Sequence, residues 1–251
     1  MPELTVAEYE ASFNRVSRLR RILQADGTRS LLEMLFGFIL SGTCSGICAA
    51  GSYKAAGSSM GLFIGSFLLL SLCCPGLIAA EKNWRNILCA AVGLVAGTSA
   101  IWIIASMRSG IPAGMIFRCV LILASFVMAM TGIVTFCKRL IGPIAAGAIT
   151  TVLLLAWISW PIWLSPALHS SHGEEIASWL VPAHPIFVCN GVLIEIFDNW
   201  AQQPMSYNLT NLGDDIFFTV PKTIWKCLIL HGGIGSLLML ASRRPNSLHH
   251  P

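Results

Sequence analysis

The chain has little charge and no motif for nucleotide, haem or zinc chemistry. Only 11% of its 251 residues are Asp, Glu, Lys or Arg, against about 25% in an ordinary soluble domain. There is no Gly-x4-Gly-Lys-Ser/Thr loop, which a nucleotide-driven pump would need. The nine cysteines follow no zinc, haem-attachment or disulfide spacing. We therefore expect no enzymatic activity, no cofactor and no nucleic-acid partner for this chain alone.

Long apolar runs take the place of the missing charge. Apolar residues make up 55% of the chain, and the mean hydropathy is +0.71. Six continuous runs approach the roughly 20 residues that a helix needs to cross about 30 Å of hydrocarbon. They occupy residues 30–50, 60–80, 86–107, 113–137, 141–164 and 220–241. This pattern predicts an all-α polytopic membrane protein with six transmembrane helices, forming a single domain over residues 1–251.

Basic residues favour one orientation of these spans. Eleven of them lie before span one, after span six or in the alternate loops: Arg15, Arg18, Arg20, Arg21, Arg29, Lys82, Arg85, Lys138, Arg139, Arg243 and Arg244. The opposite side has Lys54, Arg108, Arg118, Lys222 and Lys226. By the positive-inside rule, both termini are predicted to be cytoplasmic in a multi-pass protein of the inner (cytoplasmic) membrane. The first 30 residues lack the pattern of a removable signal peptide, so we expect span one to be retained.

Residues 5–24 predict an amphipathic helix. Apolar side chains recur at a spacing of three or four residues, and Arg15, Arg18 and Arg21 belong to the basic remainder of the segment. Such a helix lies in the membrane interface at the cytoplasmic side. The alternative is a solvated basic helix that only sets the orientation.

Residues 165–218 form the longest segment between spans, with six acidic residues and no Lys or Arg. Two apolar stretches within it are too short to cross the membrane, and Pro182 and Pro185 separate them. The segment therefore predicts a helical hairpin between spans five and six, over residues 175–199. Two interpretations are open: a re-entrant hairpin that dips into the membrane, or a small external cap.

Histidines give two further candidate sites. His169, His172, Glu174 and His184 could supply metal ligands if the Pro-rich loop folds back, but a Ser-x-x-Glu capping box at Ser171 explains most of the same pattern. We therefore predict no metal site and keep these residues as weak candidates. His231 is the ionisable residue deepest in a predicted span. It is either a pathway residue or a neutral histidine bonded to a neighbouring helix.

Small residues recur four apart in the first three spans, which favours close helix packing. The pairs are Gly42 with Gly46 and Gly93 with Gly97, followed by the series Gly57, Gly61 and Gly65. The sequence leaves open whether these faces meet within one chain or between two copies.

The arrangement of an N-terminal amphipathic helix, six spans and an outer hairpin resembles the membrane-spanning subunits of type-two ABC exporters. The loop "IAAEKNWRN" is similar to the coupling segment of that family, although the Gly-Thr pair found in many members is absent here. The resemblance implies a permease that acts with a separate cytoplasmic ATPase subunit, as a homo- or heterodimer in the lipid bilayer. It also implies a set of residues for coupling to the ATPase: Arg15, Arg18, Arg21, Glu81, Lys82 and Arg85.

Two other functions are compatible with the same sequence. The chain could be a non-catalytic subunit that anchors or assembles a larger membrane complex, since it lacks catalytic motifs. Less in keeping with the composition is a membrane enzyme that uses His231 or the histidines of the outer segment.

Overall fold

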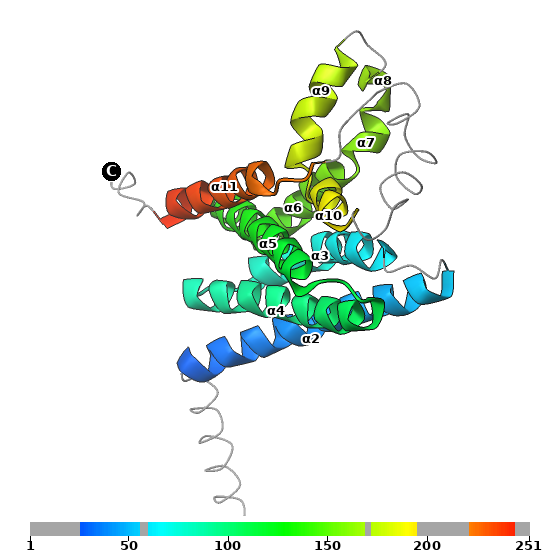
Figure 1. Cartoon of the computed structure of the whole chain (residues 1–251). Coiled ribbons are helices and arrows are strands. Elements are labelled where there is room, and N and C mark those ends of the chain that lie inside the picture. Colours follow the sequence, from blue (N-terminus) through cyan, green and yellow to red (C-terminus); the bar gives the residue numbers. More distant parts are fainter. Residues whose placement is uncertain (1–25, 56–59, 169–171, 195–220, 244–251) are drawn as a thin grey trace, which may run out of the picture.

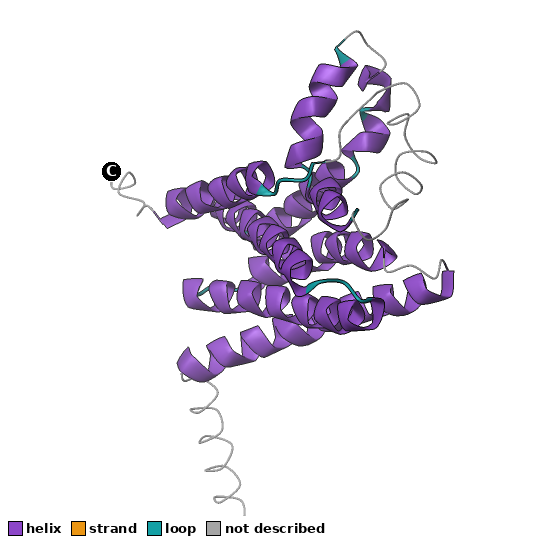
Figure 2. Ribbon diagram, viewed as in Figure 1, coloured by secondary structure: helices purple, strands orange, loops and turns teal. Residues whose placement is uncertain are grey.

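The computed structural model describes residues 26–55, 60–168, 172–194 and 221–243, and every regular element within these ranges is a helix (Figures 1 and 2). In chain order the elements are α2 (Asp26–Ala55), α3 (Met60–Ala80), α4 (Trp84–Ser109), α5 (Ala113–Ile141), α6 (Pro143–Ile158), α7 (Trp160–Trp163), α8 (Ser165–Leu168), α9 (Gly173–Leu180), the 3-10 turn η1 (Val181–Ala183), α10 (Pro185–Leu193) and α11 (Trp225–Arg243). The predicted amphipathic helix at 5–24 lies outside the described residues, as does the part of the outer segment from residue 195 to 218.

Five of these helices are long and apolar enough to cross a membrane: α2, α3, α4, α5 and α11. The prediction of an all-helical chain with several such helices is therefore confirmed. A sixth would result if α9, η1 and α10, which meet at a bend of 78°, formed one broken span. Large apolar side chains one turn apart on α2 are mainly exposed, with Leu31 at 62%, Leu35 at 52% and Ile39 at 56%. Such a stripe suits contact with lipid.

The fifth predicted span, 141–164, differs from a single long helix. Its first part, α6, has 16 residues, so it rises only about 24 Å. Pro161 has no backbone N–H to bond to the carbonyl four residues earlier, and the helix breaks at Ser159. Beyond the break, the Ile162 N–H bonds to the Ser159 carbonyl at 2.9 Å. The carbonyl of Ile158 is thereby left without its usual helical partner.

Turns at the helix ends use residues suited to them. Gly110 ends α4 in the left-handed region, at φ 69°. Gly142 joins α5 to α6 at φ 88°, and Pro143 occupies the first turn of α6, where its missing N–H costs no hydrogen bond. These residues allow sharp reversals of the chain between neighbouring helices.

Helix α5 lies at the centre of the bundle and contacts α3, α4, α6, α10 and α11. Helices α2 and α4 lie side by side, as Figure 1 shows. Gly93 and Gly97 of α4 lie directly against the backbone of α2, and a Cβ atom added at Gly37 would lie 2.8 Å from the Ala90 carbonyl oxygen. The four-residue glycine spacing in span three therefore marks a close contact within one chain.

The core beside this contact is aromatic. The ring of Trp102 lies 4.7 Å from that of Phe63 between centroids, and its indole N–H donates to Ser66 Oγ at 3.2 Å.

Helix α10 is buried along its whole length against α5 and α3. Helix α9 instead extends away from the bundle (Figure 1). The two parts of the bent pair thus have different surroundings.

Candidate functional site

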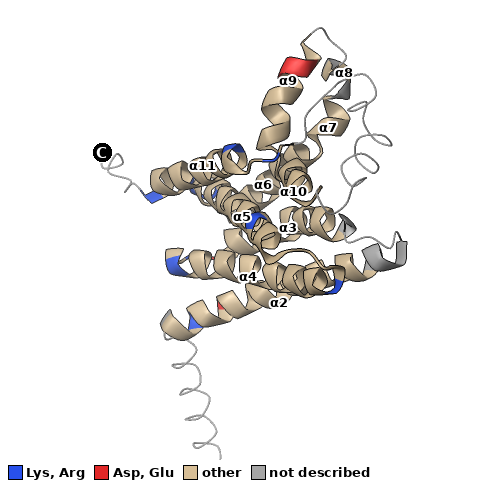
Figure 3. Cartoon of the chain, viewed as in Figure 1, with Lys and Arg blue, Asp and Glu red and all other residues tan. Residues whose placement is uncertain are grey.

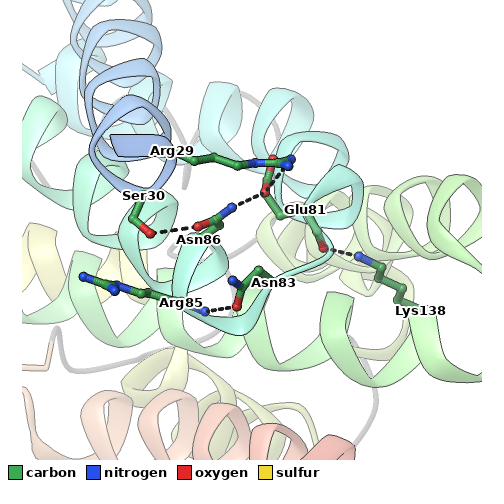
Figure 4. Close-up of polar contacts among 7 residues, drawn as sticks. All are labelled: Arg29, Ser30, Glu81, Asn83, Arg85, Asn86 and Lys138. Carbon is green, nitrogen blue, oxygen red and sulfur yellow. Dashed lines mark hydrogen bonds and ion pairs between the residues drawn. The ribbon is translucent and has the colours of Figure 1, made fainter. Parts of the chain in front are cut away.

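A cluster of polar side chains lies where the α3–α4 loop meets the start of α2 and the end of α5. Glu81 is buried at the centre of this cluster (Figure 4), with Arg29, Ser30, Asn86 and Lys138 around it. We call these five residues the Glu81 cluster. Its members come from four segments of the chain, so it ties these segments together at one end of the bundle.

The contacts of the Glu81 cluster form a chain of donors and acceptors (Figure 4). The Asn86 amide donates to the Glu81 carboxylate at 3.1 Å, and the Ser30 hydroxyl donates to the Asn86 amide oxygen at 2.9 Å. The Arg29 guanidinium is 3.6 Å from the same carboxylate, and the Lys138 ammonium donates to the Glu81 backbone carbonyl. A buried carboxylate is thus compensated by hydrogen bonds and by a nearby cation.

Local sequence explains why Asn86 reaches Glu81. Helix α3 ends at Ala80, and Asn83 caps α4 by accepting a hydrogen bond from the Arg85 backbone N–H at 3.2 Å. The short loop therefore brings Asn86, in the first turn of α4, back over Glu81. Asn86 is a polar residue at the edge of an apolar run, and this is the signal by which the sequence could have revealed it.

The predicted coupling residues are divided by the structure. Glu81 faces inward, whereas Lys82 and Arg85 are exposed. Arg15, Arg18 and Arg21 lie outside the described residues. Sequence reasoning missed Ser30, Asn86 and the partnership of Arg29 and Lys138 with Glu81.

Other contacts extend this face to α11. The Arg139 guanidinium donates to the Ala241 carbonyl at 3.0 Å, and the Arg243 guanidinium lies 4.1 Å from the ring centroid of Trp84. The start of α2, the α3–α4 loop, the end of α5 and the end of α11 therefore share one face. Figure 3 shows basic residues at helix ends and the acidic first turn of α9 at the tip of that helix, away from the bundle.

His231 is buried in α11 and bonded to a neighbouring helix. Its Nε2 accepts a hydrogen bond from the Trp157 indole N–H of α6 at 3.2 Å. Since an indole nitrogen can only donate, the imidazole proton is on Nδ1, which donates to the Cys227 carbonyl at 2.9 Å. His231 is thus a neutral histidine with both nitrogens occupied. It also lines a cavity of about 720 Å³ between α5, α6, α9 and α11.

His184 repairs the break that follows α6. Its Nδ1 accepts from the Phe187 backbone N–H at 3.4 Å and so caps α10, which places the ring proton on Nε2. That nitrogen donates at 3.1 Å to the Ile158 carbonyl, the group left free by the break. His184 is wholly buried. It therefore acts as a bridge between α6 and α10.

The weak metal candidates are not brought together. His172 is the residue that precedes α9, and it lies 3.8 Å from the exposed carboxylate of Glu175. Glu174 is exposed beside them, whereas His184 lies beyond the other end of α9. His169 and Ser171 lie outside the described residues. Among the residues that are described, no three His, Cys, Asp or Glu side chains are grouped to hold a metal ion.

Comparisons with known protein families, curated proteins and solved structures find no match to this chain. The class that the described residues themselves define is a helical protein with several apolar helices of membrane-crossing length.

Proposed function

We propose that the chain is the membrane permease subunit of an ATP-driven exporter and acts with a separate cytoplasmic ATPase subunit. The observation that carries this proposal is the Glu81 cluster. It joins the α3–α4 loop, where the exporter family has its coupling segment, to the start of α2 and the end of α5. Through these contacts, a displacement of the loop would reach both α2 and α5.

In this proposal, Lys82 and Arg85 face the ATPase and Glu81 positions the loop. Both basic side chains are exposed, so they are accessible to an acidic docking surface. Displacement of the loop would reach α2 through the Arg29 ion pair and the Ser30–Asn86 hydrogen bond. Helix α2 would then move against α4, with which it shares its glycine-lined contact. Two permease subunits, identical or different, would enclose the pathway.

The finer architecture belongs to the same proposal. Helix α6 followed by α7 completes a fifth crossing, α11 makes the sixth, and both chain ends are cytoplasmic. The bent pair α9–α10 is re-entrant, and the burial of α10 supports this, because a broken helix at membrane depth must be covered by protein. His231 lies beside the pathway, where its neutral, fully bonded ring gives it a structural role.

Copurification with a tagged chain from its native membranes tests the proposal. A cytosolic ATPase should be recovered with it, and ATP hydrolysis by the complex should depend on the loop. Charge reversal by Arg85→Glu should lower stimulated hydrolysis by at least about fivefold, at the lower end of typical coupling free energies. The matched control is Arg108→Glu, an exposed arginine at the other end of α4, which should retain the wild-type rate.

Two results would contradict the permease assignment. Equal hydrolysis rates for Arg85→Glu and the wild-type complex would remove the coupling role of the loop. Recovery of a stable set of other membrane subunits, with no ATPase, would instead favour a non-catalytic anchoring subunit.

A further inference from the structure

The cavity between α5, α6, α9 and α11 is a groove with an apolar lining. Leu153 and Leu154 of α6, Leu180 of α9 and Leu230 and Ile234 of α11 form much of its wall. We call it the α6–α11 groove. Its volume of about 720 Å³ falls within the roughly 300–1,000 Å³ of sites that hold small molecules.

The described residues that line the groove offer no free polar group along its length. His231 and the Trp157 indole are its inner polar side chains, and they are bonded to each other, with the second histidine nitrogen bonded to the Cys227 carbonyl. A polar or ionic solute would therefore lose its water without gaining partners. The lining suits a hydrocarbon chain.

One cation stands at the end of this apolar lining. Lys226 is exposed in the first turn of α11, with its ammonium 5.9 Å from the ring centroid of Trp179. Lysine and tryptophan are the residues typical of the lipid headgroup level. From Lys226 to Ile234, α11 rises about 12 Å, which is close to the roughly 15 Å depth of one leaflet.

We propose that the α6–α11 groove binds one bilayer phospholipid with an acidic headgroup. Its acyl chain lies along α6 and α11, and its phosphate faces Lys226. Three features select this occupant: the hydrocarbon lining, the Lys226 ammonium at one end, and a length that matches one leaflet. The binding site goes beyond the permease assignment, because it requires neither an ATPase nor a second copy of the chain.

Native mass spectrometry of the full chain in detergent tests this site. The probes are phosphatidylglycerol and phosphatidylcholine with the same acyl chains, titrated separately. The wild type should bind phosphatidylglycerol about fivefold more tightly, the factor that one lysine contributes near an acidic lipid. Lys226→Gln should remove this preference. Lys222→Gln, which changes another exposed lysine at the same end of α11, should keep it.

A second pair of variants tests the acyl-chain portion. Leu230→Trp should fill the groove and lower the binding of both lipids, whereas Leu237→Trp, on a side chain that is 68% exposed and outside the lining, should not. Equal wild-type affinity for the two lipids would overturn the proposal. So would an unchanged preference in Lys226→Gln, which alters only an exposed side chain and remains decisive if Leu230→Trp fails to fold. A groove covered by a second copy or by the chain's own remaining residues would give no lipid-bound species at all, and this would also overturn it.

Discussion

Glu81 has a carboxylate buried inside the protein, and it contributes to stability through the residues that bond to it. The ion pair to Arg29 adds little, because the arginine side chain is 54% exposed and such pairs contribute about 0–1 kcal/mol. The hydrogen bond from the Asn86 amide matters more, since Asn86 is itself buried. Removal of the carboxylate would leave this amide without its acceptor.

We therefore expect Glu81→Ala to lower the free energy of unfolding by about 2 kcal/mol, the cost of breaking a buried hydrogen bond to a charged group. Glu81→Gln should lose less, because its amide oxygen still accepts from Asn86. The stability of both variants is measured by thermal unfolding in detergent, which is monitored through the reactivity of cysteines that become exposed. The control is Glu175→Ala, at an exposed site. Equal losses for Ala and Gln would show that charge, and not the hydrogen bond, stabilises the loop.

His184 supplies the second prediction for a single residue. His184→Ala removes the cap of α10 and the donor to the Ile158 carbonyl, so it should destabilise the protein by about 2–4 kcal/mol. His184→Asn can still cap α10 and should lose roughly half as much. His172→Ala, at an exposed ring, should change stability by less than about 0.5 kcal/mol. Equilibrium unfolding compares the three. A melting temperature that falls on addition of a chelator would contradict this structural role and revive the metal interpretation.

The limits of sequence reasoning at this scale are visible in the histidines. Spacing alone placed His184 among possible metal ligands. The structure shows that the helix break before Pro161 leaves the Ile158 carbonyl without a helical donor, and that the His184 ring N–H bonds to it. That bond joins two segments 26 residues apart in the chain. For His231, the neutral hydrogen-bonded alternative agrees with the contacts to Trp157 and Cys227. A role in a pathway stays a prediction.

Helix α11 is held against α5 by a close backbone contact. A Cβ atom added at Gly132 would lie 2.6 Å from the Gly235 carbonyl oxygen, and one added at Gly235 would lie 2.6 Å from the Met128 carbonyl carbon. Backbone atoms cannot move aside as a flexible side chain can. The contact therefore admits no side chain without separating the two helices.

Gly235→Ala should accordingly lower the free energy of unfolding by about 1–3 kcal/mol, as overpacking does. The matched control is Gly233→Ala on the same helix, since a Cβ atom at Gly233 would meet nothing within 4 Å. That substitution should be neutral or slightly stabilising, because alanine favours a helix more than glycine does. Denaturant unfolding in mixed micelles compares them. If both variants lost the same stability, the α5–α11 contact would be looser than the structure indicates.

The helices themselves were largely predictable, because apolar length dictates where a chain can cross a membrane. The break in the fifth span was less so: Pro161 stands within an apolar run, and only the structure shows where the chain resumes a helix. Gly93 and Gly97 were found through their spacing. Gly132 and Gly235 are partners from two different helices, and no repeat within either helix reveals that pairing. A Cβ atom at Gly46 would meet nothing within 4 Å, so the four-residue spacing of Gly42 and Gly46 does not indicate a close contact at Gly46.

The described part of the molecule has one face where basic side chains join the ends of several helices, and a separate part that carries the acidic first turn of α9. Contacts on this face join the ends of α2, α5 and α11 to the α3–α4 loop and to the start of α4. The basic residues that make them are Arg29, Lys138, Arg139 and Arg243. The acidic turn of α9 extends from the bundle elsewhere. The groove, the Glu81 cluster and the bent pair gain their proposed roles only if these two parts lie in different compartments.

Labelling from outside intact cells tests this orientation. In a background without the native cysteines, Glu174→Cys should react with a membrane-impermeant maleimide, because the residue is exposed in the predicted outer segment. Lys82→Cys should react only after lysis, although its side chain is also exposed, because the positive-inside rule retains cationic loops in the cytoplasm. Each site is the control for the other, because both side chains are exposed and only the membrane can make their labelling differ. Labelling of Lys82→Cys in intact cells, with Glu174→Cys protected, would show that the protein has the opposite orientation. The Glu81 cluster would then lie where no cytoplasmic ATPase could reach it.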